Sequence, residues 1–152
     1  MLYLVIAFGI CGLDLWVKNR VEARETENAS REILGGRILL RKSHNRGAAL
    51  NFLEEKQKLV AGWSTVLFAG LLGSFLAILG KRGQGLRKMG MALLVGGAAS
   101  NVYDRLKRSY VVDYFSFQGA WKKLRNVVFN LGDLFILLGS FLVILWNLRR
   151  KS

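Results

Sequence analysis

The stretch VVFNLGDLFILLGSFLVILWNL at residues 127–148 decides how the chain folds. It contains one charged residue, Asp133, and about 20 apolar residues are enough to cross a bilayer as a helix. A carboxylate inside lipid is costly, so an ionisable residue in a span is a functional candidate. The stretch therefore predicts a membrane-spanning helix and, within it, a site.

Three more apolar blocks occur in the chain, and the charged residues collect between them. Four such helices leave no room for a soluble domain, so we expect a single all-α integral membrane domain over residues 1–152. Gly96 and Gly97, with Ser100, should let the third helix pack closely against its neighbours. The predicted spans are 2–17, 59–80, 89–104 and 127–148, and the outer loops are 18–58 and 105–126.

The short connections predict the orientation. The loop KRGQGLRK at 81–88 and the tail RRKS carry seven positive charges and no acid, which favours the cytoplasmic side for both, and hence for both termini. The loop 18–58 is also basic, but it is long and contains six Glu, so it is a weaker signal. The net charge of +13 fits anionic lipid head groups, and because it is dispersed around the spans we expect no nucleic-acid partner.

The single Cys and single His limit the possible chemistry. Cys11 has no partner for an internal disulfide, and we expect it to contact lipid or another helix. His44 lies among basic residues, has no second His or Cys to complete a zinc site, and is expected to be a solvated loop residue. We therefore expect no metal, no cofactor and no Ser–His or Cys–His hydrolase.

The first outer loop contains a hairpin signal. REILGGRILLRK at 31–42 places two apolar runs around Gly35 and Gly36. One interpretation is an ordinary surface loop. The other is a small sheet on the membrane surface, able to hold an extended peptide by strand addition.

Polar residues converge on the outer third of the predicted bilayer. Asp133 is seven residues into a span entered from outside, about 9–10 Å deep at a rise of 1.5 Å per residue. Asn130 precedes it by three residues and shares its helical face. The other polar residues at this level are Asp14 in the first span, Asn101, Asp104 and Arg105 at the end of the third, and Asp113 in YVVDYFSF.

Most of these residues also have a purely structural interpretation. Asp104 and Arg105 can form an interfacial ion pair, and Asn101 and Asn130 can join helices by hydrogen bonds. Asp133 is harder to explain in this way, because no Lys or Arg occurs within its own predicted span.

Two facing carboxylates suggest a definite chemistry. Asp113 and Asp133 cannot both ionise easily if they face each other, so they would share a proton. One can then act as general base on a water and the other as general acid, as in aspartic proteases. Two Asp residues twenty positions apart are a weak signal, and a proton relay or ion pathway fits them as well.

Five short motifs, in this order, resemble those of signal peptidase II, the lipoprotein signal peptidase family of bacteria. They run through most of the chain, and their combination is much more specific than any one of them. They are LDLWVK at 13–18, NRGAALNFL at 45–53, GGAASNVYDR at 96–105, VVDYF at 111–115 and FNLGD at 129–133.

The resemblance implies an endopeptidase that cleaves diacylglyceryl-modified prolipoproteins just before the lipidated Cys, with Asp113 and Asp133 as its catalytic pair. It implies four transmembrane helices, a periplasmic β-cradle from the first outer loop, a short periplasmic helix in the second, and no metal. We expect a monomer in the cytoplasmic membrane with its site near the outer face. Supporting or substrate-binding roles fall on Asp14, Asn45, Asn101, Asp104, Arg105 and Asn130.

Leu15, Leu50 and Asn51 depart from the family pattern, and so do two further residues: Ser100 stands where the family usually has Gly, and Gly132 where it usually has Ala. None of these changes removes an acid or an amide from the proposed site. Two other functions stay open at this point: a small transporter that uses Asp14 and Asp133 as a proton or cation relay, and a non-catalytic lipoprotein-binding relative.

Overall fold

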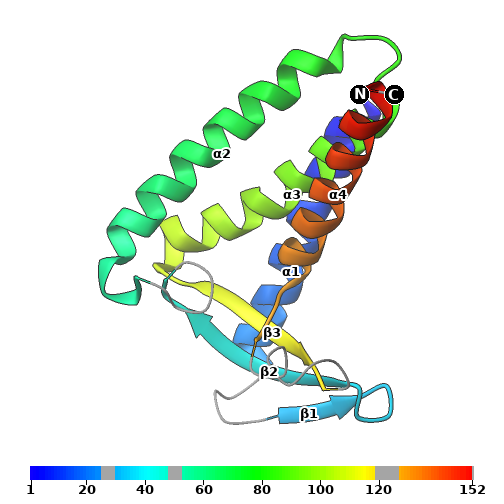
Figure 1. Ribbon diagram of the computed structural model, residues 1–152. Coiled ribbons are helices and arrows are strands. Elements are labelled where there is room, and N and C mark those ends of the chain that lie inside the picture. Colours follow the sequence, from blue (N-terminus) through cyan, green and yellow to red (C-terminus); the bar gives the residue numbers. More distant parts are fainter. Residues whose placement is uncertain (25–29, 48–52, 119–126, 152) are drawn as a thin grey trace.

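The computed structural model describes residues 1–24, 30–47, 53–118 and 127–151. This part of the chain forms four α-helices and one three-stranded sheet. The sheet lies at one end of the helices, and both chain termini lie together at the other end (Figure 1). This arrangement fits the even number of crossings that the sequence predicts.

The helices differ from the predicted spans mainly at their ends. The first helix continues past Val17, where Asp14 and Lys18 form an i,i+4 ion pair. The last helix begins at Leu131, so the predicted start at 127 is wrong, and Asp133 lies in its first turn rather than seven residues inside. The helices are α1 (Leu2–Arg24), α2 (Gln57–Leu79, preceded by the 3-10 turn η2 at Glu54–Lys56), α3 (Gly85–Arg108) and α4 (Leu131–Lys151).

Three of these helices, α1, α2 and α4, are long and apolar enough to cross a membrane. The fourth, α3, has charged residues in both its first and its last turns. It packs against each of the other three helices, so much of its surface is covered by protein. The structure therefore has a mostly helical membrane architecture, in which three spans are indicated by composition.

Close packing around α3 depends on its glycines. A Cβ added at Gly97 would collide with the carbonyl oxygen of Gly132 in α4, and one added at Gly96 would lie 2.7 Å from the carbonyl oxygen of Ala7 in α1. Small residues allow helix backbones to approach in this way. The predicted close packing at both positions is confirmed.

Replacing Gly97 with Ala should therefore destabilise the protein, by about 1–3 kcal/mol, the usual cost of overpacking. The obstacle is backbone, so α3 must move away from α4. Thermal unfolding in detergent measures the effect. Gly70→Ala on α2 is the matched control, because nothing lies within 4 Å of its added Cβ. Equal melting temperatures for the two variants would contradict the prediction.

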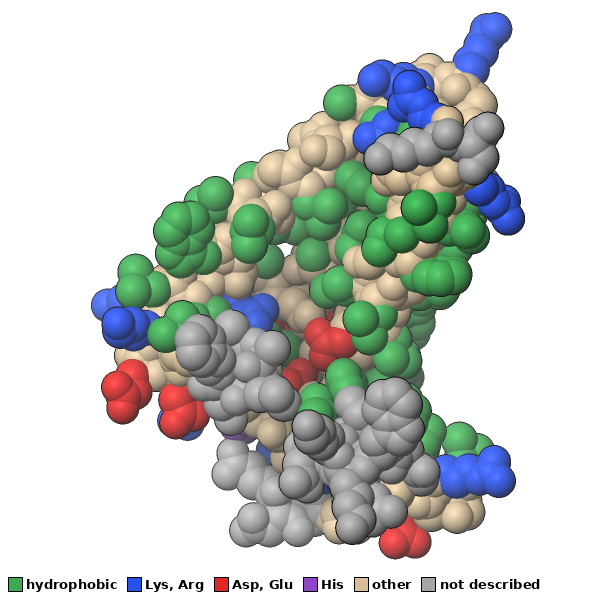
Figure 2. Space-filling view, in the orientation of Figure 1, with side chains coloured by type: hydrophobic (Ala, Val, Ile, Leu, Met, Phe, Trp, Pro, Cys, Tyr) green, Lys and Arg blue, Asp and Glu red, His purple; other side chains and the backbone are tan. Residues whose placement is uncertain are grey.

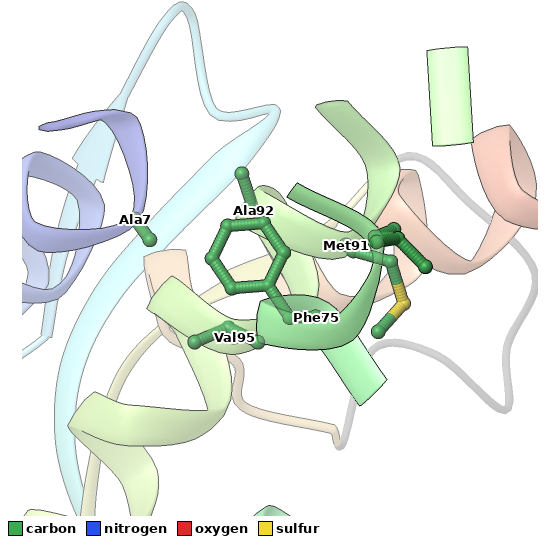
Figure 3. Packing of buried hydrophobic residues seen from close by; sticks show 6 residues of the cluster. Ala7, Phe75, Met91, Ala92 and Val95 are labelled. Carbon is green, nitrogen blue, oxygen red and sulfur yellow. The ribbon is translucent and has the colours of Figure 1, made fainter. Parts of the chain in front are cut away.

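An apolar cluster joins α2 to the other helices. The ring of Phe75 is fully buried against α3, as Figure 3 shows. Burying a Phe side chain stabilises a fold by roughly 1.5–3 kcal/mol. The cluster consists of Ala7 from α1, Phe75 and Ile78 from α2, and Met91, Ala92 and Val95 from α3.

The predicted hairpin in the first outer loop is confirmed. Its two strands pair from Ile33 with Ile38, and the turn between them contains Gly35 and Gly36 at φ +67° and +80°. Glycine is favoured there because side chains are strained at positive φ. The sheet has the order β1-β2-β3, with antiparallel pairs. Its strands are β1 (Ser30–Ile33), β2 (Ile38–Asn45) and β3 (Val111–Phe117).

The third strand is an addition to the predicted cradle, because it comes from the second outer loop. It pairs with β2 from Ile38 opposite Phe117 to Asn45 opposite Val111, with an irregularity between Leu40 and Ser43. The described part of the loop predicted to contain a short helix, residues 105–118, holds instead the end of α3 and this strand; residues 119–126 lie outside the described residues. Aromatic and β-branched residues dominate VVDYFSF, which explains the strand.

Candidate active site

Asp113 and Asp133 line one cavity of about 290 Å³ where β2, β3, α3 and α4 meet. Asp113 comes from the middle of β3, and Asp133 from the first turn of α4. Figure 2 shows acidic side chains inside a hollow that is bordered by apolar side chains. The cavity is also lined by Asn45, Asn101, Arg105, Val111, Val127, Val128, Phe129, Ile136 and Leu137.

Asn130 links the two carboxylates. It precedes α4, and its Oδ1 accepts the Asp133 backbone N–H at 2.9 Å, while Oδ2 of Asp133 accepts the Asn130 backbone N–H at 3.1 Å. This reciprocal arrangement is a capping box at the start of a helix. The amide nitrogen of Asn130 then donates to Oδ1 of Asp113 at 2.7 Å. The same residue thus starts α4 and fixes both acids.

Asn101 and Asn45 each direct an amide NH₂ group at one of the acids. Asn101 donates to Oδ1 of Asp133 at 2.9 Å, and Asn45 donates to Oδ2 of Asp113 at 3.3 Å. The Oδ1 atom of Asn45 in turn accepts the Gly47 backbone N–H at 3.2 Å. Each carboxylate therefore receives two hydrogen bonds from fixed donors.

Asp14 and Asp104 lie beside this pair and are fully buried. They share a partner that the sequence interpretation missed: the ammonium of Lys18, which is 2.9 Å from Asp14 and 3.1 Å from Asp104. Lys18 falls one residue beyond the predicted first span, so it was assigned to a loop. Its i,i+4 spacing from Asp14 is the signal that could have found it.

Tyr114 is a second residue that was missed. Its hydroxyl donates to Oδ1 of Asp14 at 3.1 Å and accepts the Leu131 backbone N–H at 3.0 Å. It thus ties α1 to the first turn of α4. Burial and the nearby charge of Asp14 raise the pKa of Tyr114, so the phenol stays a donor.

Asp104 and Arg105 make contacts other than the mutual ion pair that the sequence allowed. Asp104 pairs with Lys18 and with Arg108, and its Oδ2 accepts the Val112 backbone N–H at 3.2 Å, which anchors β3 to α3. Arg105 donates instead to the backbone oxygens of Asn101 and Gly47, each at 3.4 Å. Arg105 also lines the cavity.

His44 was expected to be a solvated loop residue, and this expectation is wrong. It lies on β2, with Nε2 2.7 Å from Oε1 of Glu22 and its ring 4.1 Å from that of Tyr110. These contacts join the sheet to the end of α1. Cys11 is a free cysteine on α1. Among the described residues, no group of three or more His, Cys, Asp or Glu side chains is placed to hold a metal ion.

Two of the departures from the family pattern, Ser100 and Gly132, lie together around Asp14. The Ser100 hydroxyl donates to Oδ2 of Asp14 at 2.6 Å, and a Cβ added at Gly132 would lie 2.9 Å from the same oxygen. In this chain, Ser100 therefore adds a hydrogen bond to Asp14, and Gly132 leaves room for that carboxylate.

The environment of Asp113 changes its acidity. Burial, and then the charge of Asp133, raise the pKa of Asp113 to about 7, although the donors on Asn130 and Asn45 lower it. Two carboxyl groups in one site normally titrate as a pair. Such a pair can hold one proton at neutral pH, which is the state that acid–base catalysis on a peptide bond requires.

Comparisons with known proteins cover nearly the whole chain. A family model described as signal peptidase (SPase) II matches residues 6–149. The lipoprotein signal peptidase of Neisseria gonorrhoeae is 32% identical over 155 residues, which cover 99% of this chain and 91% of that protein. The lipoprotein signal peptidase of Clostridioides difficile is 30% identical over 158 residues, covering 100% and 98%.

Two solved structures, both described as a bacterial membrane enzyme, share the fold. One has a TM-score of 0.85 and covers 99% of this chain and 89% of its own. The other has a TM-score of 0.80, with 96% and 92% covered. Each is 21% identical in sequence, so the likeness concerns the fold.

Proposed function

The chain belongs to the signal peptidase II family, and from this membership we infer that Asp113 and Asp133 are the catalytic pair of a membrane aspartic endopeptidase. The protein is a protease that removes signal peptides from lipoproteins. The observation that carries the catalytic assignment is the shared cavity, in which Asn130 holds both carboxylates.

The proposed reaction needs one proton on the pair. The ionised aspartate takes a proton from a water, whose oxygen attacks the scissile carbonyl carbon. The protonated aspartate gives its proton to the carbonyl oxygen, forming a gem-diol. Collapse of this intermediate breaks the C–N bond, and the amine leaves with a proton returned by the pair.

The proposed substrate is a diacylglyceryl-modified prolipoprotein, cut just before its lipidated Cys. We assign the sheet and the cavity to the outer face of the cytoplasmic membrane and both termini to the cytoplasm, with α3 as a fourth span. The charges support this orientation, because the α2–α3 connection and the C-terminal tail are basic and acid-free. We propose a monomer in lipid with no nucleic-acid partner.

Supporting roles follow from the contacts. Asn45, Asn101 and Asn130 hold the acids by their amides, and Arg105 lines the cavity, where it can bind a substrate carbonyl. Asp14 and Asp104 do not contact the catalytic acids directly. Both form ion pairs with Lys18, and Asp104 also accepts a hydrogen bond from the backbone of β3. A transporter would need polar groups across the whole membrane, whereas the buried cluster around Phe75 is apolar.

The test is a cleavage assay with purified protein in detergent and a diacylglyceryl-modified prolipoprotein, followed by the mass of the products. We expect a single cut directly before the modified Cys. The same precursor without the lipid is the matched substrate control. A folded protein that leaves the lipidated precursor intact, or cuts it elsewhere, would overturn the proposal.

The dependence of kcat/KM on pH should show the titration of the Asp113–Asp133 pair. The proton on Asp113 is lost as the pH rises through about 7, so kcat/KM should fall on the alkaline side near that pH. Asn45→Ala removes a donor that favours the ionised form of Asp113, so its pKa rises further and the alkaline limb should move to higher pH.

Asn19→Ala is the control for this shift, because Asn19 contacts Arg108 at the surface instead of the pair. Rate–pH profiles of the three proteins would be compared. An alkaline limb that stays in place in Asn45→Ala, or moves to lower pH, would contradict the prediction.

A further inference from the structure

Lys18 is a fully buried ammonium with several fixed partners. Its Nζ is 2.9 Å from Asp14 and 3.1 Å from Asp104, and it donates to Ser100 at 3.0 Å and to Oδ1 of Asn101 at 2.8 Å. An ammonium can only donate hydrogen bonds. Whatever group it meets must therefore present an acceptor to it.

This requirement fixes the orientation of Asn101. Because Lys18 needs an acceptor, the amide of Asn101 must turn its oxygen to Lys18 and its NH₂ group to Asp133. The reverse orientation would place two donors face to face on one side and two acceptors on the other. Lys18 thereby controls a hydrogen bond to Asp133 that it does not make itself.

Asp133 is the acid better arranged to carry the negative charge. One of its oxygens accepts from Asn101, and the other from the backbone N–H of Asn130. It also lies in the first turn of α4, where the helix dipole favours a negative charge. The amide of Asn101 lies between the ammonium of Lys18 and the carboxylate of Asp133 and bonds to both.

Asp113 is the acid better arranged to keep the proton. It lies on a strand, is 4% exposed, and one of its two amide donors, Asn45, is 3.3 Å away. Burial and the charge of Asp133 raise the pKa of Asp113 to about 7, which agrees with this distribution of the proton.

We propose that Lys18 is a positioning residue that, through Asn101, keeps Asp133 ionised as the general base and leaves the shared proton on Asp113 as the general acid. In the reaction, Asp133 takes the proton from the attacking water, and Asp113 gives its proton to the scissile carbonyl oxygen. The inference rests on the proposed function and assigns the two roles within it.

The substitution that tests the role of Lys18 has to take account of the charged residues around it. Asp14 from α1 and Asp104 from α3 face the ammonium directly, while Arg108 pairs with Asp104. From β3, Tyr114 donates to Asp14. Removing Lys18 alone would leave two buried carboxylates and one cation, so the variant should also remove the charge of Asp14.

The compensated variant is Lys18→Met/Asp14→Asn, measured for kcat, KM and their pH dependence on the lipidated precursor. Without the ammonium the ionised form of Asp133 is less favoured. The acidic limb should therefore move to higher pH by roughly one unit, and kcat should drop about tenfold, with KM changed less than about twofold.

Asn101→Leu gives the second measurement, because it cuts the connection to Asp133 while both ion pairs of Lys18 stay in place. It should move the acidic limb in the same direction. Phe75→Leu, in the apolar cluster, lowers stability without touching the site and should leave the limb unchanged. The proposal would be overturned if the Lys18→Met/Asp14→Asn and Asn101→Leu proteins are folded and both keep the acidic limb of the wild-type rate–pH profile.

Infrared spectra separate this inference from the proposed function, because they need no substrate. In a pH titration, the carboxyl band that titrates near pH 7 should disappear in Asp113→Asn. In Asp133→Asn it should persist but titrate at lower pH, because the charge of Asp133 no longer raises the pKa of Asp113. The opposite pattern would overturn the assignment of the proton. Wild-type protein that fails to cut the lipidated precursor would refute the function while the spectra still decide where the proton lies.

Discussion

Asn in place of either Asp113 or Asp133 should lower kcat by at least about 10³-fold, because each change removes one half of the acid–base pair. An amide cannot take a proton from water or give one to a carbonyl oxygen at neutral pH. Asparagine is close to aspartate in shape, so the fold should be kept. Single-turnover cleavage of the lipidated precursor, followed by mass spectrometry, measures the loss.

Two controls are needed: one for the loss of a negative charge and one for correct folding. Glu55→Gln removes an exposed acid in the turn η2, outside the cavity, and should cleave at the wild-type rate. Thermal unfolding of both Asp variants would establish that they are folded. The double variant should be no slower than the slower single one, because residues that act as a unit are not additive. A folded Asp113→Asn or Asp133→Asn protein with near wild-type turnover would rule out the pair.

The apolar blocks predicted the helices well, because hydropathy measures what lipid requires of a sequence. The apolar pattern predicted the start of α4 incorrectly, because it placed the start at residue 127 and the helix begins at Leu131. Residues 127–130 are as apolar as the helix that follows, but the backbone of Phe129 bonds to β3, and the amide of Asn130 caps the helix. Hydropathy does not distinguish a helical turn from an extended segment that leads into it.

The sheet was only half predicted, for a related reason. The hairpin of β1 and β2 is local, and Gly35–Gly36 marks its turn. The pairing of β2 with β3 joins residues about seventy positions apart, and no local pattern specifies such a contact. The apolar run around Asp113 was therefore not predicted as a strand, although it is the strand that holds this acid.

The acids and amides of the site were found because polar residues are rare in apolar surroundings. Lys18 was missed because cations next to a predicted span look like ordinary interfacial residues, and only the three-dimensional structure shows that it is buried. Asn45 was selected through the resemblance alone, since nothing around it in the loop marks it. Its hydrogen bond to Asp113 depends on the pairing of β2 with β3.

Lys18→Met alone should cost about 3–5 kcal/mol of unfolding free energy, the usual penalty for breaking a buried ion pair by removing one partner. The loss is large because Asp14 would stay buried without a cation and Asp104 would keep only Arg108, and an unpaired buried charge is far more costly than a lost contact. Chemical denaturation in detergent measures it.

Asp14→Asn in the same background should recover much of this stability, because Asp104 keeps Arg108 as its partner and the local charges balance again. Recovery in the double variant distinguishes a charge effect from lost packing, since the methionine is the same in both proteins. If Lys18→Met is as stable as the wild type, or if Asp14→Asn lowers its stability further, the ammonium does not hold the site together. In that case its four contacts reflect proximity, and the acids behind the catalytic pair must be stabilised in another way.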